Sequence, residues 1–319
     1  MREALYGPTG FFVRDDAGPA AHFRTSVHVS PLFARALLRL LDRLDQALGR
    51  PDPIDVVDVG AGRGELLTQL RALAPPSLAR RLRLTAVELA PRPPALAADI
   101  AWRAEVPRGL TGLLVANEWL DNVPLDVARD GRYLLVDLDT GEETPGPPLD
   151  PADADWARRW WPAPPDEPVE LGRPRDEAWA EAVRAVHRGL ALAIDYGHLR
   201  ADRPIAGTLT GYRSGRQVPP LPDGTRDLTA HVAIDSVADA GSAAAGGRPY
   251  QLVSQRTALR ALGIHGRRPP LALASTDPAA YLRALADASA AAELTDPAGL
   301  GAHWWLLQPV NADLGDVLG

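Results

Sequence analysis

The chain has 319 residues, of which 46% are hydrophobic and 24% charged, and its net charge is −7. This length and apolar content suit a globular protein and exclude disorder as the whole structure. The acidic balance argues against a nucleic-acid-binding protein, which needs a basic face. All 34 basic residues are arginine and there is no cysteine. Lysine Schiff bases, disulfides and thiolate nucleophiles are therefore excluded, and a cytoplasmic location is expected. We predict no membrane span and no metal site.

Strand signals alternate with helix-length segments along the chain. We predict buried strands at 54–59, 82–89, 112–116, 190–195, 250–253 and 303–308. A helix is predicted over 30–48, with Ser30 as N-cap and Pro31 at its first position, and another over 65–73 after the first strand. This alternation predicts an α/β protein with a mostly parallel sheet covered on both faces.

Two stretches interrupt this alternation. Residues 127–188 start with a hairpin-like turn and contain a proline-rich stretch with three tryptophans, so we interpret them as an inserted subdomain. The predicted organisation is a helical lead-in over 1–50, a core over 51–126 and 189–319, and this insertion. Residues 198–228 are rich in Gly, Pro and Arg with little periodicity. A loop of this length is usually functional or disordered, and we hypothesise a mobile lid, with an ordered surface loop as the alternative.

The first predicted strand runs directly into a glycine turn with glycines at Gly60, Gly62 and Gly64. Glycines let a ligand approach the backbone closely, and the following helix offers unpaired N–H groups. A dinucleotide-binding turn would have a third glycine at position 65, where this chain has Glu65. A carboxylate there disfavours a pyrophosphate but suits a ligand with a cationic ammonium and sulfonium. The pattern therefore favours S-adenosylmethionine, although a structural turn without a ligand is the alternative.

Acidic residues accompany this turn. Glu88, at the end of the second strand, is placed to accept hydrogen bonds from ribose hydroxyls, and Asp58 could face the ligand amino group. The third strand ends at Asn117 and Glu118, where functional groups of open α/β sheets gather. Glu118 could instead cap the helix that follows it.

Several segments together resemble the MidA-type (DUF185) S-adenosylmethionine-dependent methyltransferases, which include a mitochondrial complex I assembly methyltransferase. The matching segments are 5–12, 23–26, 30–33, 57–64, 116–118, 120–124, 195–197, 207–209 and 227–232. Val27-His28-Val29 stands where a Pro-Glu pair is expected, and residues 142–175 match poorly. These differences bear on the choice of substrate more than on the use of the cofactor.

The resemblance implies a Rossmann-like, seven-strand class I methyltransferase sheet with S-adenosylmethionine as cofactor. We assign Thr25 and Asn117 to the cofactor site together with the residues above. The resemblance also implies methylation of a protein arginine, in its best-understood branch on a respiratory complex I subunit. A carboxylate must then orient the guanidinium, and Glu118 is the first choice, with Asp227 or His231 completing the site. A small-molecule methyltransferase and a non-catalytic assembly factor are the alternatives, and no oligomeric state is predicted.

Overall fold

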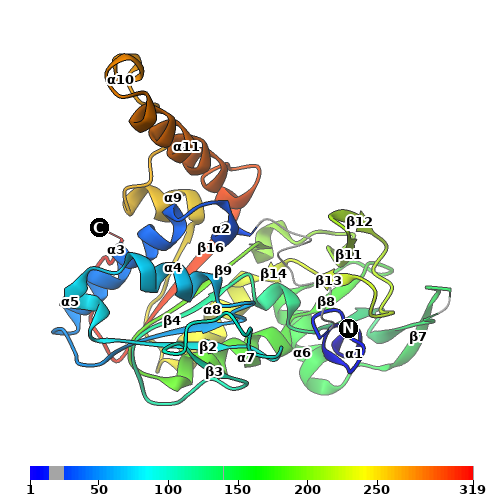
Figure 1. The fold of residues 1–319 in the computed structure, drawn as a ribbon. Helices are drawn as coiled ribbons and strands as arrows, with labels where there is room; N and C mark the ends of the chain where they lie inside the picture. The colour runs from blue at the N-terminus through cyan, green and yellow to red at the C-terminus, as the bar shows by residue number, and fades with distance from the viewer. Residues whose placement is uncertain (14–24, 139, 319) are drawn as a thin grey trace.

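A seven-stranded sheet forms the centre of the molecule (Figure 1). The computed structural model describes residues 1–13, 25–138 and 140–318. The strand order is β15-β16-β9-β4-β1-β2-β3, and only β16 runs against its neighbours within this sheet. The strands are β1 (Ile54–Val59), β2 (Leu82–Val87), β3 (Ala101–Arg103), β4 (Leu110–Asn117), β9 (Val186–Asp195), β15 (Gln251–Ser254) and β16 (Trp304–Val310).

All six strands predicted from the sequence are present, and the mostly parallel α/β architecture is confirmed. The edge strand β3 was not predicted, because three residues carry too little periodicity to be recognised. The predicted first helix is α3 (Leu32–Ala47), with Pro31 rather than Ser30 at the N-cap. Ser30 still accepts a hydrogen bond from the N–H of Leu32 at 3.1 Å, so its hydroxyl supports the start of the helix.

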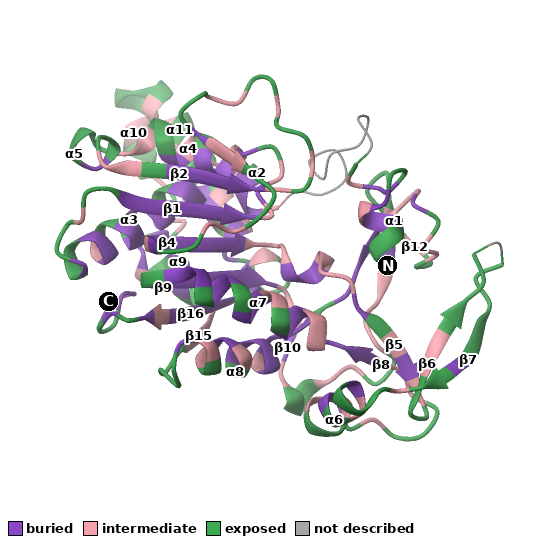
Figure 2. Cartoon of the chain, turned by 90° about the horizontal axis from the view of Figure 1, so that it is seen from below, coloured by how far each residue is buried: buried purple, intermediate pink, exposed green. Residues whose placement is uncertain are grey.

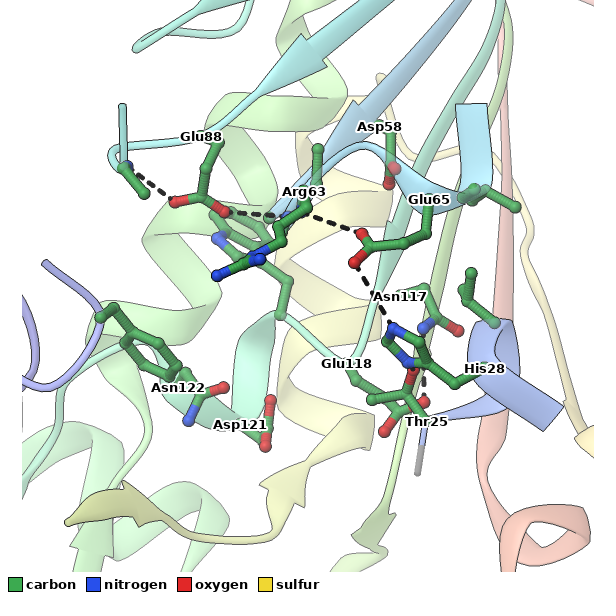
Figure 3. A pocket seen from close by; sticks show the side chains of 18 of the residues that line it. Thr25, His28, Asp58, Arg63, Glu65, Glu88, Asn117, Glu118, Asp121 and Asn122 are labelled. Atoms are coloured by element: carbon green, nitrogen blue, oxygen red, sulfur yellow. Dashed lines mark hydrogen bonds and ion pairs between the residues drawn. The ribbon is translucent and has the colours of Figure 1, made fainter. Parts of the chain in front are cut away.

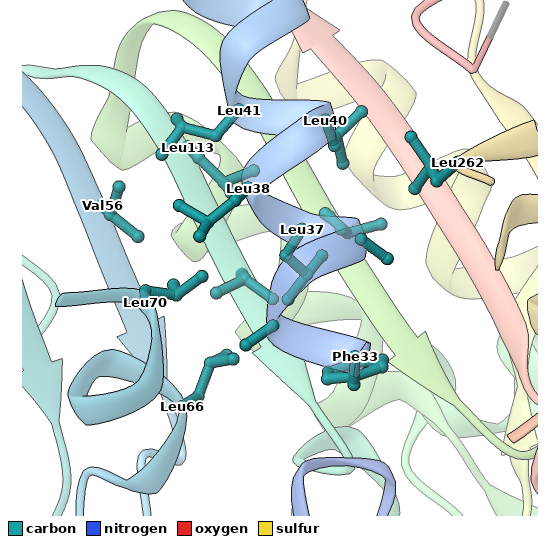
Figure 4. Close-up of a cluster of buried hydrophobic side chains, with 14 of the residues drawn as sticks. Phe33, Leu37, Leu38, Leu40, Leu41, Val56, Leu66, Leu70, Leu113 and Leu262 are labelled. Carbon is teal, nitrogen blue, oxygen red and sulfur yellow. The ribbon is translucent and has the colours of Figure 1, made fainter. Parts of the chain in front are cut away.

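Helices cover both faces of the sheet, and each face has its own hydrophobic core. On one face, α3 and α4 (Glu65–Leu73) pack against the strands, together with α9 (Gln255–Ala261). Figure 4 shows leucines of α3 directed towards Leu66 and Leu70 of α4 and towards Leu113 of β4. On the other face lie α7 (Arg173–Ala185) and α8 (Ile234–Ala244), which contribute Trp179 and Val237. Burying such side chains stabilises the fold by about 1.5–3 kcal/mol each and fixes the strand ends that carry the site.

A second, smaller sheet lies beside the central one, in the region predicted as an insertion. Its order is β7-β6-β5-β8, all antiparallel. The elements are β5 (Asp126–Arg129), β6 (Arg132–Val136), β7 (Glu143–Pro148), α6 (Pro151–Trp160) and β8 (Val169–Leu171). The following helix α7 packs on the central sheet. The domain boundaries given above stay a prediction.

The segment 198–228 is more regular than the sequence indicated. β11 (Thr210–Arg213), β12 (Arg216–Val218) and β13 (Asp227–Thr229) form an antiparallel sheet. β10 (Gly197–His198) pairs with β14 (Val232–Ala233), and η3 (Arg200–Asp202) lies between these elements in the chain. The weak periodicity of the segment thus conceals short strands, while movement of the segment as a lid stays a prediction.

The remaining helices lie around the central sheet or extend from it. They are α1 (Arg2–Tyr6), α2 (Ser26–Val29), α5 (Pro76–Ala79), η2 (Leu120–Asn122), α10 (Leu271–Thr276), α11 (Pro278–Leu294) and η4 (Leu300–Ala302). Figure 2 shows the central strands buried, whereas α10 is largely exposed. No helix of the described residues has the length and apolarity to cross a membrane. Phe23 and Arg24 of the segment 23–26 lie outside the described residues.

Candidate active site

The glycine turn connects β1 to α4 at the carboxyl edge of the sheet. Gly60, Gly62 and Gly64 all have positive φ, at 72°, 58° and 81°, so the turn requires glycine at each position. A Cβ on Gly60 would lie 2.7 Å from Trp119, and one on Gly64 would lie 2.7 Å from Leu96. A Cβ on Gly62 would meet only Glu65, at 3.4 Å. Gly60 and Gly64 therefore allow close packing, while Gly62 leaves open space above the turn.

That open space is part of a cavity of about 540 Å³, which is in the usual range for small-molecule sites. Its walls come from the glycine turn, the carboxyl ends of β1, β2, β4 and β9, and the N-terminal segments around α1 and α2. Figure 3 shows side chains from these elements converging on the cavity. The described lining includes six carboxylates: Asp58, Glu65, Glu88, Glu118, Asp121 and Asp227. The cavity is thus strongly acidic.

The two acidic residues predicted to accompany the turn both line the cavity. Glu88 accepts hydrogen bonds from the N–H groups of Gly62 at 3.1 Å and of Leu89 at 2.7 Å, which fix the orientation of its carboxylate. Burial raises its pKa. Asp58 is buried at the end of β1, and burial, with Glu65 and Glu88 nearby, raises its pKa well above the ordinary value. Both carboxyls would gain from a ligand that supplies hydrogen-bond donors or positive charge.

Glu118 directly follows β4 and adopts a positive φ of 51°, which is unusual for a residue with a side chain. Its Oε1 accepts hydrogen bonds from the N–H of Ser26 at 3.0 Å and from the amide of Asn117 at 3.3 Å. Burial is the main cause that raises its pKa to about 7. The carboxylate is held in the cavity wall by a segment 92 residues away in sequence.

The alternative interpretation of Glu118 as a helix cap was wrong. The N-cap residue of the short helix η2 is Trp119, and its side chain makes no capping hydrogen bond. The N–H groups of Leu120 and Asp121 instead donate to Oδ2 of Asp195, at 2.9 and 3.3 Å. Asp195 is buried at the end of β9, so the carboxyl end of that strand supports η2.

The segment that includes β13 brings one of its two predicted residues into the cavity wall. Asp227 lies there and accepts a hydrogen bond from the side chain of Asn122 at 3.1 Å. Burial, reinforced by Asp121, raises its pKa to about 8. His231 is not among the lining residues. Its ring packs edge-on against Tyr196 with centroids 5.1 Å apart, and partial burial lowers its pKa. His231 is an exposed residue outside the cavity wall.

The other two residues assigned to the cofactor site line the cavity as well. Asn117 has its side-chain oxygen Oδ1 buried without a hydrogen-bond partner among the described residues. The hydroxyl of Thr25 lies 2.7 Å from Nδ1 of His28, and both side chains belong to the start of α2.

Sequence reasoning missed several lining residues, among them Tyr6, His28, Tyr196 and His303. Tyr196 follows the end of β9, so the rule on strand ends could have identified it. Its hydroxyl bonds to the carboxylate of Asp121, which also accepts from Thr229 at 2.7 Å. His303 is buried, and burial lowers its pKa to about 4, so it is neutral at neutral pH. Tyr6 lies in the matching segment 5–12 and His303 at the start of a predicted strand, but neither follows a strand end, so the same rule does not identify them.

A second cavity of about 410 Å³ adjoins the first and shares Gly60, Glu88 and Trp119 with it. Its walls are mainly apolar, with Val87, Leu89 and Val106 from the strand ends and the alanines of α7. Glu105, just after β3, also lines it. The same rule on strand ends would have identified Glu105 if β3 had been predicted.

A glycine turn, an acidic residue ending the second strand and a cavity at the carboxyl edge define a nucleoside-binding α/β enzyme site. The family model described as "Putative S-adenosyl-L-methionine-dependent methyltransferase" matches residues 32–253, more than half of the chain. The chain therefore belongs to this family, and it is an S-adenosylmethionine-dependent methyltransferase with a class I methyltransferase sheet.

Solved structures agree with this assignment. The chain is similar to a COG1565 superfamily member from Burkholderia thailandensis bound to S-adenosyl-homocysteine. That pair has 26% sequence identity and a TM-score of 0.79, and it covers 98% of this chain and 87% of that chain. The native crystal structure of a COG1565 superfamily protein from the same organism gives a TM-score of 0.78 at 26% identity, with 99% and 87% coverage. No curated protein matched the chain.

Proposed function

We propose that the chain methylates the guanidinium group of an arginine side chain in a protein. The observation that carries this proposal is that Glu118, Asp121 and Asp227 line one cavity. Within the described residues, no arginine or histidine forms an ion pair with any of the three. Burial raises the pKa of Glu118 to about 7 and that of Asp227 to about 8, so a bound cation would stabilise both in their ionised form.

The residues around the glycine turn fit S-adenosylmethionine. Glu88 would accept the ribose hydroxyls, and Asp58 would receive the ammonium group. The open space above Gly62 and the unpartnered Oδ1 of Asn117 are both suited to a ligand at the turn. The adjoining apolar cavity, with Glu105 at its wall, would hold the adenine base. Bound there, the cofactor supplies an electrophilic methyl group.

The acidic wall would then prepare the acceptor. A guanidinium is planar and stays protonated in water, so a carboxylate must orient it. The same carboxylate would take up a proton as the nitrogen gains the methyl group, the bond from sulfur to this methyl group breaks and S-adenosylhomocysteine leaves. Glu118 suits both tasks, because its pKa of about 7 is near that of an effective general base at neutral pH. Asp227 would hold the cation from the other side. His231 would act only through Tyr196, against which it packs.

A protein acceptor, and a respiratory complex I subunit in particular, follows from the family resemblance. A small-molecule methyltransferase would be expected to have a closed, apolar pocket, whereas this cavity has six carboxylates in its wall. That acidity favours a cationic acceptor over a neutral one. An assembly factor that binds the cofactor without turnover is the remaining alternative.

The test is transfer of a labelled methyl group from S-adenosylmethionine to an extract of cells that lack the gene. We expect a labelled protein band that yields methylarginine on hydrolysis. Glu118→Gln should remove the label, while the matched control Glu142→Gln, on an exposed turn, should keep it. Label in a small molecule alone would support the second function. Cofactor binding with no labelled product from several extracts would support the third.

A further inference from the structure

A histidine and a glutamate from different helices face each other in the cofactor cavity. Nε2 of His28, on α2, lies 3.5 Å from Oε1 of Glu65, the first residue of α4. Nδ1 of His28 lies 2.7 Å from the hydroxyl of Thr25. All three side chains line the cavity, and the His28 side chain is 28% exposed. Figure 3 shows His28 across the cavity from Glu88.

The glycine turn itself has little capacity left for an anionic group. The N–H of Gly62 donates to Glu88 at 3.1 Å, and the N–H of Arg63 donates to Oε2 of Glu65 at 2.9 Å. The N–H of Gly64 donates to the carbonyl of Ala61 at 2.8 Å. These three N–H groups of the turn are thus already engaged, two of them by carboxylates. A carboxylate on the ligand needs a cation from elsewhere in the wall.

Three residues in the described lining could supply that cation: His28, Arg63 and Arg92. Arg92 donates to the backbone carbonyls of Ile100, Leu96 and Ala97, which keep it in the connection between β2 and β3. Arg63 lies between Glu88 and Glu65 above the glycine turn (Figure 3). His28 lies at the end of the cavity opposite Glu88. If the ribose binds Glu88, the amino-acid end of the cofactor extends towards His28.

We propose that His28 binds the carboxylate of the amino-acid portion of S-adenosylmethionine through its Nδ1–H, which exchanges the Thr25 hydroxyl for the ligand, while Glu65 and Asp58 receive the ammonium group. The pair His28–Glu65 would thus recognise both charges of a zwitterion, and binding would require His28 to be protonated. This inference rests on the cofactor placement proposed above and is independent of the methyl acceptor.

The surroundings of His28 favour its protonated form. The hydrogen bond and charge of Glu65, together with the charge of Glu118, raise the pKa of His28 against the opposing effect of partial burial. Helices α3 and α11 also pack on α2, but none of their described residues is among the charges that act on this pKa. Cofactor affinity should therefore fall as the pH rises through the pKa of His28. Asp58 and Glu88 act in the opposite direction, because their ionisation at higher pH strengthens the binding of a cation or a donor.

The test compares two ligands that differ by one group, S-adenosylhomocysteine and its decarboxylated analogue. Their affinities are measured by calorimetry at about pH 6 and about pH 8.5, on either side of an ordinary histidine pKa. For the unmodified chain we expect S-adenosylhomocysteine to bind on the order of ten-fold more weakly at the higher pH, as for loss of one charge-assisted hydrogen bond. The decarboxylated analogue should show no such loss.

Variants separate His28 from the other titrating groups. His28→Gln should weaken the binding of S-adenosylhomocysteine at the lower pH and abolish the further loss of affinity at the higher pH. The affinity for the decarboxylated analogue should stay unchanged. Glu65→Gln should shift this loss of affinity to lower pH, because Glu65 raises the pKa of His28. His187→Gln, an exposed histidine at the opposite end of β9, is the matched control and should behave like the unmodified chain. An NMR titration of His28 should show its pKa rising when S-adenosylhomocysteine binds.

Three results would overturn the inference: equal pH dependence for the two ligands, a His28→Gln variant with unchanged pH dependence, or a ligand-insensitive pKa of His28. The methyl acceptor does not enter any of these measurements. The predicted binding pattern without any transfer to protein would therefore support this inference and refute only the proposed function.

Discussion

Replacing Glu118 by glutamine separates the role of this carboxylate in the reaction from its role in the fold. The Gln side chain keeps the shape and can still accept from the N–H of Ser26, whose distance to Oε1 is 3.0 Å. It cannot take up a proton from a guanidinium. We expect turnover to fall by about 10²–10⁴-fold, the usual contribution of a general base. The affinity for S-adenosylhomocysteine should stay within a few-fold, because the lost interaction belongs to the acceptor.

The same substitution should stabilise the protein at alkaline pH. Burial holds the pKa of Glu118 at about 7, against 4.5 for an ordinary glutamate, so its ionised form carries a penalty of roughly 3 kcal/mol. Because the folded-state pKa is the higher one, this penalty is absent below 4.5 and grows as the pH rises to about 7. Glu118→Gln should remove this loss of stability. At about pH 8 the free energy of unfolding of the variant should therefore exceed that of the unmodified chain by up to roughly 3 kcal/mol, and the variant should unfold at a higher urea concentration. Near pH 4.5 the two should differ little.

Urea unfolding and single-turnover methyl transfer, both carried out at two pH values, provide the assay. The exposed control Glu142→Gln should change neither quantity. A Glu118→Gln variant that loses stability at alkaline pH and keeps its turnover per folded molecule would refute the reasoning. Equal losses of cofactor affinity and turnover would place Glu118 in the cofactor site instead.

Three further predictions concern other parts of the site. Gly62→Leu should abolish S-adenosylhomocysteine binding in calorimetry by filling the space above the turn. Gly109→Leu, at a position that also has a positive φ and open surroundings, should lose stability but still bind. Asp227→Asn should raise the KM for a cationic acceptor. It should also remove the part of the pH–rate profile that rises towards about pH 8, where the buried carboxyl ionises. An unchanged profile would exclude Asp227 from the acceptor site. In hydrogen exchange, a lid over 199–226 should be protected only with cofactor and substrate bound, while equal protection in both states would mean a permanently packed sheet.

The sequence was most informative where structure depends on neighbours in the chain. The bounds of β1 and α4 were predicted to the residue, because a β-branched run, three glycines and a helical repeat follow one another directly. Glu88, Asn117 and Glu118 were found by the rule that ligands bind at the carboxyl ends of parallel strands. This rule needs only the positions of the strand ends, which the runs of apolar residues in the sequence predict.

The rest of the cavity depends on contacts between distant segments. Tyr6 comes from α1 and His303 from the loop after η4, and nothing in their local sequence indicates that they meet. The sheet of β11, β12 and β13 was missed because its strands have only three or four residues, too few to show a periodic pattern. Glu170 anchors the preceding turn by accepting hydrogen bonds from Leu209 at 2.6 Å and from the hydroxyl of Thr208 at 2.7 Å. These contacts favour a packed segment over a freely mobile one.

The sequence alone could not decide whether Glu118 caps the helix η2 or faces the substrate, and the structure shows that Asp195 supports the helix. Glu118 stands just before η2, where a capping residue would stand, but its positive φ and its bond to Ser26 keep it in the cavity wall. Asp195, 75 residues further along the chain from Leu120, supports the helix instead. Because Asp195 satisfies the free N–H groups of η2, Glu118 does not have to. The support of the helix and the proposed contact with substrate are thus divided between the ends of two adjacent strands, β9 and β4, and only their pairing in the sheet brings these ends together.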